Sequence, residues 1–123
     1  KAVYDMYAVS TDGLMTMNVT YKNLGLLSGA SMTAQEYVEQ AAATLPGDLA
    51  ACGFADAEVQ ITAQDLAAER DCPTLLVTAQ LQDMSMYERM VCIQSGDYIY
   101  CVTLCSFTED VTADMAALFH RAW

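Results

Sequence analysis

The amino-acid sequence predicts a single α+β domain over residues 1–123, with an antiparallel sheet of about six strands sandwiched between two helices. The chain of 123 residues is long enough for one domain with a core. Its 54% hydrophobic and 17% charged residues exclude a disordered chain and a coiled coil. Period-two alternation of apolar residues dominates, and two stretches of helical spacing interrupt it in the order ββ-α-ββββ-α.

The first element is a hairpin centred on Asp12-Gly13, a favoured type I′ pair in which both central residues take positive φ. A two-residue loop at this point would pair Thr11 with Leu14. The pairing gives the two strands one largely apolar face, on which Ser10 opposes Met15, Ala8 opposes Met17, Met6 opposes Val19 and Tyr4 opposes Tyr21.

A helix is predicted after residues 23–31, because Thr33-Ala-Gln-Glu36 is a capping box and Met32 and Tyr37 form a hydrophobic staple around it. Pro46-Gly47 is expected to stop or kink this helix, and a short second piece would close at Gly53. Helical spacing predicts its buried stripe: Ala34, Tyr37, Val38, Ala41, Ala42 and Leu45.

From residue 57 onward, alternation predicts four strands in a meander. Arg70–Pro73 is interpreted as the first turn, residues 83–86 as the second, and Gly96-Asp97 as a type II′ hairpin. The strand over 98–107 has two apolar faces, which is typical of a central strand covered on both sides.

The last element is predicted to be a helix capped by Thr108, with acids in its first turn and Arg121 near its end. Its expected apolar face comprises Val111, Met115, Leu118, Phe119 and Ala122.

Charge and composition restrict the partners. The chain has 16 acids and 5 scattered bases, a formal net charge of −11, so nucleic acid and anionic membranes are not expected partners. No run approaches the roughly 20 apolar residues of a transmembrane helix. Because the chain starts at Lys1, we interpret it as a mature form with any signal peptide or lipid anchor upstream. One histidine, the absence of CxxC spacing and the absence of a calcium loop predict no metal and no cofactor.

The layout resembles the Mog1/PsbP-like fold, in particular its small bacterial members of unknown function. The resembling segments are the Thr33–Tyr37 helix opening, the Gly96-Asp97-Tyr98 hairpin and the Leu118–Trp123 ending. The resemblance implies an extracytoplasmic protein, secreted or lipid-anchored, and it supplies no catalytic set. With it, the sequence predicts a non-catalytic binding or protein-interaction module for an unknown protein or small molecule. A small Cys/His hydrolase-type enzyme is the alternative.

Four groups of residues are candidate sites. Cys92 and Cys101 face each other across the predicted hairpin at a non-hydrogen-bonded pair, so they either form a disulfide or pack as two buried thiols. His120 with a cysteine would serve the enzyme hypothesis, although its place at a helix end favours an ordinary charge partner.

Methionines and tyrosines supply the other candidates. Met15/Met17 and Met84/Met86 have a spacing suited to Cu(I), although the first pair more simply lines the core. An interaction patch is expected from Tyr98, Tyr87, Met84 and Met86, whereas Tyr100 is expected to pack under a helix.

Overall fold

A computed structural model describes residues 3–23, 33–67, 69–96 and 98–119. The elements follow in the order β1 (Val3–Val9), β2 (Met15–Asn23), α1 (Ala34–Ala51), β3 (Ala55–Leu66), β4 (Glu69–Leu81), β5 (Met84–Ser95), β6 (Tyr98–Phe107) and α2 (Thr112–Ala117). The strands form one six-stranded antiparallel sheet in the order β1-β2-β6-β5-β4-β3. The predicted α+β class, with this sheet and two helices, is confirmed.

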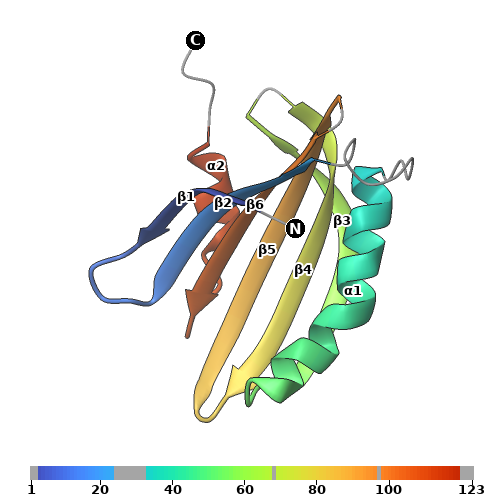
Figure 1. The fold of residues 1–123 in the computed structure, drawn as a ribbon. Helices are drawn as coiled ribbons and strands as arrows, with labels where there is room; N and C mark the ends of the chain where they lie inside the picture. Colours follow the sequence, from blue (N-terminus) through green and yellow to red (C-terminus); the bar gives the residue numbers. More distant parts are fainter. Residues whose placement is uncertain (1–2, 24–32, 68, 97, 120–123) are drawn as a thin grey trace.

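The two helices lie on opposite faces of the sheet (Figure 1). Helix α1 packs across β3, β4 and β5, whereas α2 contacts β5 and β6. The core is therefore divided into two clusters. The cluster under α1 includes Val38, Leu75 and Ile99, and the cluster under α2 includes Val91 and Leu104.

Strand β6 lies in the middle of the sheet, between β2 and β5. Its side chains alternate between the two clusters, with Ile99 and Cys101 on the α1 side and Val102 and Leu104 on the α2 side. This explains the two apolar faces that the sequence shows.

The first hairpin keeps its predicted register near the middle, with Ala8 opposite Met17, but its loop differs. The Ser10 N–H donates to the Met15 carbonyl at 2.9 Å, and the Gly13 N–H donates to the Ser10 carbonyl at 3.0 Å. The loop is thus wider than a two-residue turn. Positive φ occurs at Gly13 but not at Asp12, so the type I′ prediction is wrong. An irregularity near Tyr4 also shifts that residue to face Thr20 instead of Tyr21.

The predicted capping box opens α1. The Glu36 N–H donates to the Thr33 hydroxyl at 3.1 Å, and the Thr33 N–H donates to the Glu36 carboxylate at 3.0 Å. Met32, the other half of the predicted staple, lies outside the described residues.

Pro46 does not end this helix, which continues to Ala51 and is followed by Gly53 at φ +94°. Leu45 and Leu49, on either side of the proline, both pack against the core, and this packing offsets the lost hydrogen bond. The ribbon bends along its length (Figure 1), as a proline allows.

The first turn of the meander lies earlier than predicted. Strand β4 already begins at Glu69, so Arg70–Pro73 is strand and not turn. Chain reversal occurs beside Ala67 at φ 54°, and Pro73 pairs with Ala63 of β3. Asp71, at φ 52°, donates its N–H to the Asp65 carboxylate at 2.9 Å, and this irregularity accommodates the proline. The Gly96 hairpin pairs Ser95 with Tyr98 as predicted, while Asp97 lies outside the described residues.

Helix α2 is shorter than predicted, with six residues from Thr112. Thr108 has φ 77° and does not cap it; instead Asp110 accepts from the Thr112 N–H at 3.0 Å. Leu118 is 77% exposed although it was assigned to the apolar face, because the helix ends at Ala117. Arg121 and Ala122 lie outside the described residues.

Candidate binding site beside the second helix

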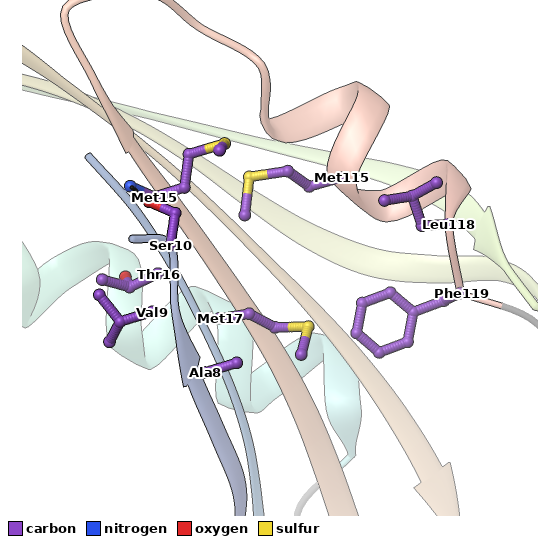
Figure 2. Close-up of a pocket in the computed structure, with 9 residues that line it drawn as sticks. All are labelled: Ala8, Val9, Ser10, Met15, Thr16, Met17, Met115, Leu118 and Phe119. Atoms are coloured by element: carbon purple, nitrogen blue, oxygen red, sulfur yellow. Dashed lines mark hydrogen bonds between the residues drawn. The ribbon is translucent and has the colours of Figure 1, made fainter. Parts of the chain in front are cut away.

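An apolar pocket of about 540 Å³ lies between the β1–β2 hairpin and the end of α2. Its wall is made almost entirely of aliphatic, thioether and aromatic side chains (Figure 2). The lining residues are Ala8, Val9, Ser10, Met15, Thr16, Met17, Met115, Leu118 and Phe119. A pocket of this size falls within the ~300–1,000 Å³ range of small-molecule sites.

The strand period and the shortness of α2 create this pocket. Met15 and Met17 occupy alternate positions of β2, opposite Ser106 and Leu104 of β6, and therefore share the face that carries α2. In Figure 2 the side chains of Met15 and Met115 point toward each other, and that of Met17 points toward the ring of Phe119. Thioether side chains are flexible and polarisable, so such a wall adapts to ligands of varied shape.

The lining offers a ligand few hydrogen-bonding groups. The Ser10 hydroxyl donates to Asp12 at 2.6 Å and accepts from the Met15 N–H at 3.1 Å. The hydrogen bond from the Ser10 hydroxyl and one from the Leu14 N–H lower the pKa of Asp12, which stays ionised. Thr16 is the register partner of Cys105, on the α1 side of the sheet, so its hydroxyl does not face the pocket. The pocket thus offers a ligand contact area and little hydrogen bonding.

A tyrosine cluster lies farther along the same face. The cluster consists of Tyr21 on β2 and of Tyr98 and Tyr100 on the neighbouring strand β6. The centroids of the three rings lie 6.0 to 6.2 Å from one another. Tyr98 and Tyr100 are 36% and 37% exposed, so the prediction that Tyr100 packs under a helix is wrong. Helix α2 contacts the sheet near Leu104 and does not reach this end of β6.

The predicted patch of Tyr98, Tyr87, Met84 and Met86 does not form one surface. Met86 is 2% exposed and belongs to the core under α1, because its position in β5 faces that helix. Met84 pairs with Leu81 at one end of β5, whereas Tyr98 pairs with Ser95 at the other. Tyr87 is half-buried, and it lies on the opposite face of β5 from Met84 and Met86 because side chains alternate along a strand.

The sequence did not identify the side chains that gather around Tyr98 and Met15 on the α2 side of the sheet. The available signal was the long apolar face of β2, which exceeds what a short final helix can cover. Met17, Val19 and Tyr21 follow one another on that face. The positions of Met115 and Phe119 depend on where α2 ends, and local spacing does not determine this.

A second, polar hollow of about 440 Å³ lies on the α2 face over β3, β4 and β5. Its central group is Arg89, whose Nε donates to the Thr112 hydroxyl at 3.2 Å and whose Nη1 donates to the Gln64 side chain. Arg89 is therefore engaged in holding α2 to the sheet. The lining carries Glu58 and Asp110 besides, so it does not present an uncompensated cation to an anionic ligand.

Cys72, Cys92 and Cys105 of the sheet are poor nucleophiles. Burial raises the pKa of Cys72, and neighbouring acids add to the effect. Burial and the charge of Glu88 raise the pKa of Cys105 to about 11. The hydrogen bond with Cys101 and then burial raise the pKa of Cys92 far above its ordinary value. His120, the predicted base, lies outside the described residues.

No group of three or more His, Cys, Asp or Glu side chains within the described ranges could hold a metal ion. Met15 and Met17, the thioethers considered for Cu(I), are half-buried in the wall of the pocket. Their assignment to the core therefore holds only in part.

Comparison with known protein families finds no match, and neither does comparison with curated proteins. Among the helices in the described part of the chain, none is long and apolar enough to cross a membrane.

Proposed function

We propose that the protein is a non-catalytic binding module whose pocket beside α2 takes an apolar, uncharged small molecule. The observation that carries the proposal is the pocket of about 540 Å³ walled by Met15, Met17, Met115 and Phe119. The resemblance to the Mog1/PsbP-like fold supports an extracytoplasmic bacterial location, secreted or lipid-anchored.

Charge and hydrogen bonding support an apolar ligand. The net charge of −11 disfavours anions at long range. Because the Ser10 hydroxyl is engaged with Asp12 and the Thr16 side chain lies on the other side of the sheet, a polar ligand would lose its hydration without replacement partners. An apolar ligand has no hydrogen bonds to water to lose. Its binding is favoured because the apolar surfaces of the ligand and of the pocket wall are removed from water.

A protein partner is a second candidate function, and the tyrosine cluster favours it. Exposed, stacked tyrosines supply large contact area at low conformational cost. The Cys/His enzyme has less support, because burial keeps the Cys72 and Cys105 thiols protonated at neutral pH.

Titration with N-phenyl-1-naphthylamine, a neutral apolar fluorophore, tests the pocket. We expect saturable fluorescence enhancement by the wild-type protein and at least about tenfold weaker binding by Leu118→Asp and Met115→Gln, because each puts a polar group in the wall. Leu118 is exposed, so its substitution spares the core.

Met84→Asp is the matched control, because Met84 is also exposed and lies at the β4–β5 turn, away from the pocket. It should bind the fluorophore like the wild type. No enhancement by the wild type, or equal binding by all three variants, would remove the pocket as the site. If Tyr98→Ala loses fluorophore binding and Leu118→Asp keeps it, the binding site is the tyrosine cluster and not the pocket.

A further inference from the structure

We propose that Cys92 and Cys101 form a disulfide that links β5 to β6 beneath α1. The two residues are register partners, and their Sγ atoms lie 2.9 Å apart as thiols. About 0.9 Å separates this distance from an S–S bond of ~2.05 Å, so small side-chain rotations suffice.

The strand pairing makes the backbone compatible with the bond. Ser95 and Tyr98 close the hairpin as a hydrogen-bonded pair, and counting along the ladder makes Cys92 and Cys101 a non-hydrogen-bonded pair. Cα atoms at such a pair are ~4.5 Å apart. A disulfide accepts ~4.4–6.8 Å, so the pair falls at the short end of the range.

The other cysteines are placed too far away to compete. Cys72 belongs to the cluster on the opposite face of the sheet. Cys105 lies four residues beyond Cys101 on β6, ~13 Å along the strand, and faces Glu88 and Thr16 instead. Cys52 is exposed at the end of α1.

The bond lies in a sealed part of the core. Cys92 and Cys101 are 0% and 3% exposed, and Val38 of α1, at 0%, belongs to the same cluster. The Ala34 N–H at the start of α1 donates to the Gln94 side chain of β5 at 3.0 Å, so the helix is fixed over the pair. Reagents therefore reach the thiols before α1 docks, and the finished bond is protected from reductant afterwards.

The oxidant we assign is a disulfide of the glutathione type, written R–S–S–R. One cysteine thiolate attacks it, which forms a mixed disulfide and releases RS⁻; the second attacks the cysteine sulfur of that mixed disulfide and releases another RS⁻. Both cysteine protons end on the two released thiolates, so the products are the protein disulfide and two RSH. In the cell this step rests on the proposed extracytoplasmic location, where such oxidants persist.

The test supplies the oxidant in vitro, so its result does not depend on location or on the pocket. The reduced full chain is refolded from urea with oxidised and reduced glutathione, alkylated under denaturing conditions and mapped by mass spectrometry. We expect three alkylated cysteines and one linked peptide pair joining Cys92 to Cys101. Dithiothreitol should cleave the bond in urea and leave it intact in the native protein.

Stability provides the second readout. The disulfide closes a loop of about ten residues and should raise the folding equilibrium constant roughly 100-fold. Reduction in urea, followed by refolding without oxidant, should abolish this gain. Cys105→Ser should keep the bond, whereas the double variant Cys92→Ala, Cys101→Ala should lose all redox dependence. Five alkylated cysteines after oxidative refolding, or a disulfide between any other two cysteines, would overturn the assignment. The mapping of the wild-type protein decides this, even if a variant misfolds.

Discussion

The two faces of the sheet are closed by helices of very different length. On one face α1 covers three strands with 18 residues, and Val38 beneath it is 0% exposed. On the other, α2 has six residues, and Leu118 just beyond it is 77% exposed. Helix length therefore decides where a pocket forms, because an apolar strand face becomes a pocket wall wherever no helix covers it.

On the α1 side of the sheet, too, a helix covers some strands and leaves others uncovered. Helix α1 packs mainly on β3, β4 and β5 and reaches side chains of β6, so the hairpin strands beyond β6 lack a covering helix within the described residues. Tyr7 and Val9 of β1 point to this side and are 61% and 49% exposed. Apolar residues thus serve as core under α1 and as surface next to it.

The largest expected effect distinguishes the closed face from the open one. Leu75→Ala should lower the free energy of unfolding by about 3 kcal/mol, because Leu75 is 0% exposed in the cluster under α1 and its truncation leaves a cavity. Met17→Ala, in the pocket wall, should cost about 1 kcal/mol or less, since the site is already partly open. Urea unfolding followed by circular dichroism measures both.

Equal losses in the two variants would break the comparison, because they would show that the pocket wall is packed as tightly as the core. Leu118→Ala is the control for the open face and should change the midpoint by little.

Sequence reasoning succeeded where short-range chemistry decides the structure. The Thr33–Glu36 capping box and the Gly96 hairpin follow from residues a few positions apart, and the hairpin set the Cys92–Cys101 register. Reasoning failed where tertiary packing opposes local preference. Pro46 remains inside α1 because Leu45 and Leu49 are held on the sheet, and Pro73 lies within a strand because a local irregularity accommodates it.

The candidate site was predictable only in its β2 half. Alternation places Met15 and Met17 on one face of the hairpin, but it cannot say what lies opposite. What lies opposite depends on the bounds of α2, whose N-cap is Val111 and not the predicted Thr108, because Thr108 takes positive φ. The helix is also shorter at its other end, and this leaves Phe119 beyond it.

The second expected effect concerns how the short helix is held. Arg89→Ala should lower the free energy of unfolding by about 1.5 kcal/mol, because it removes hydrogen bonds that join β5 to Thr112 of α2 and Gln64 of β3. The looser α2 should also weaken fluorophore binding. Urea unfolding and amide hydrogen exchange over α2 measure the change.

Arg70→Ala is the matched control, since its contact with Asp65 is 3.9 Å long and both side chains are exposed. It should cost less than about 0.5 kcal/mol. If the two arginine variants behave alike, α2 is held by its apolar contacts alone and the Arg89 interactions contribute nothing measurable.

The smallest expected effect is a gain in stability on the α1 side of the sheet. Glu88 lies between Val77 and Cys105 on that side, and burial raises the pKa of its carboxyl above 4.5. The folded protein therefore prefers the neutral acid. This preference stabilises the fold below the ordinary pKa, and the contribution is lost as the pH rises through the raised value.

Glu88→Gln should accordingly raise the free energy of unfolding by about 1 kcal/mol at pH 7, because an amide needs no proton to stay neutral. The gain should shrink on acidification and vanish at about pH 3, well below the ordinary pKa, where the wild-type carboxyl is protonated in both states. Urea midpoints across this range measure it, with Glu58→Gln on the exposed opposite side as the control. A glutamine variant less stable than wild type at pH 7 would mean that the Glu88 carboxylate is solvated, and that the α1 side is open at this strand.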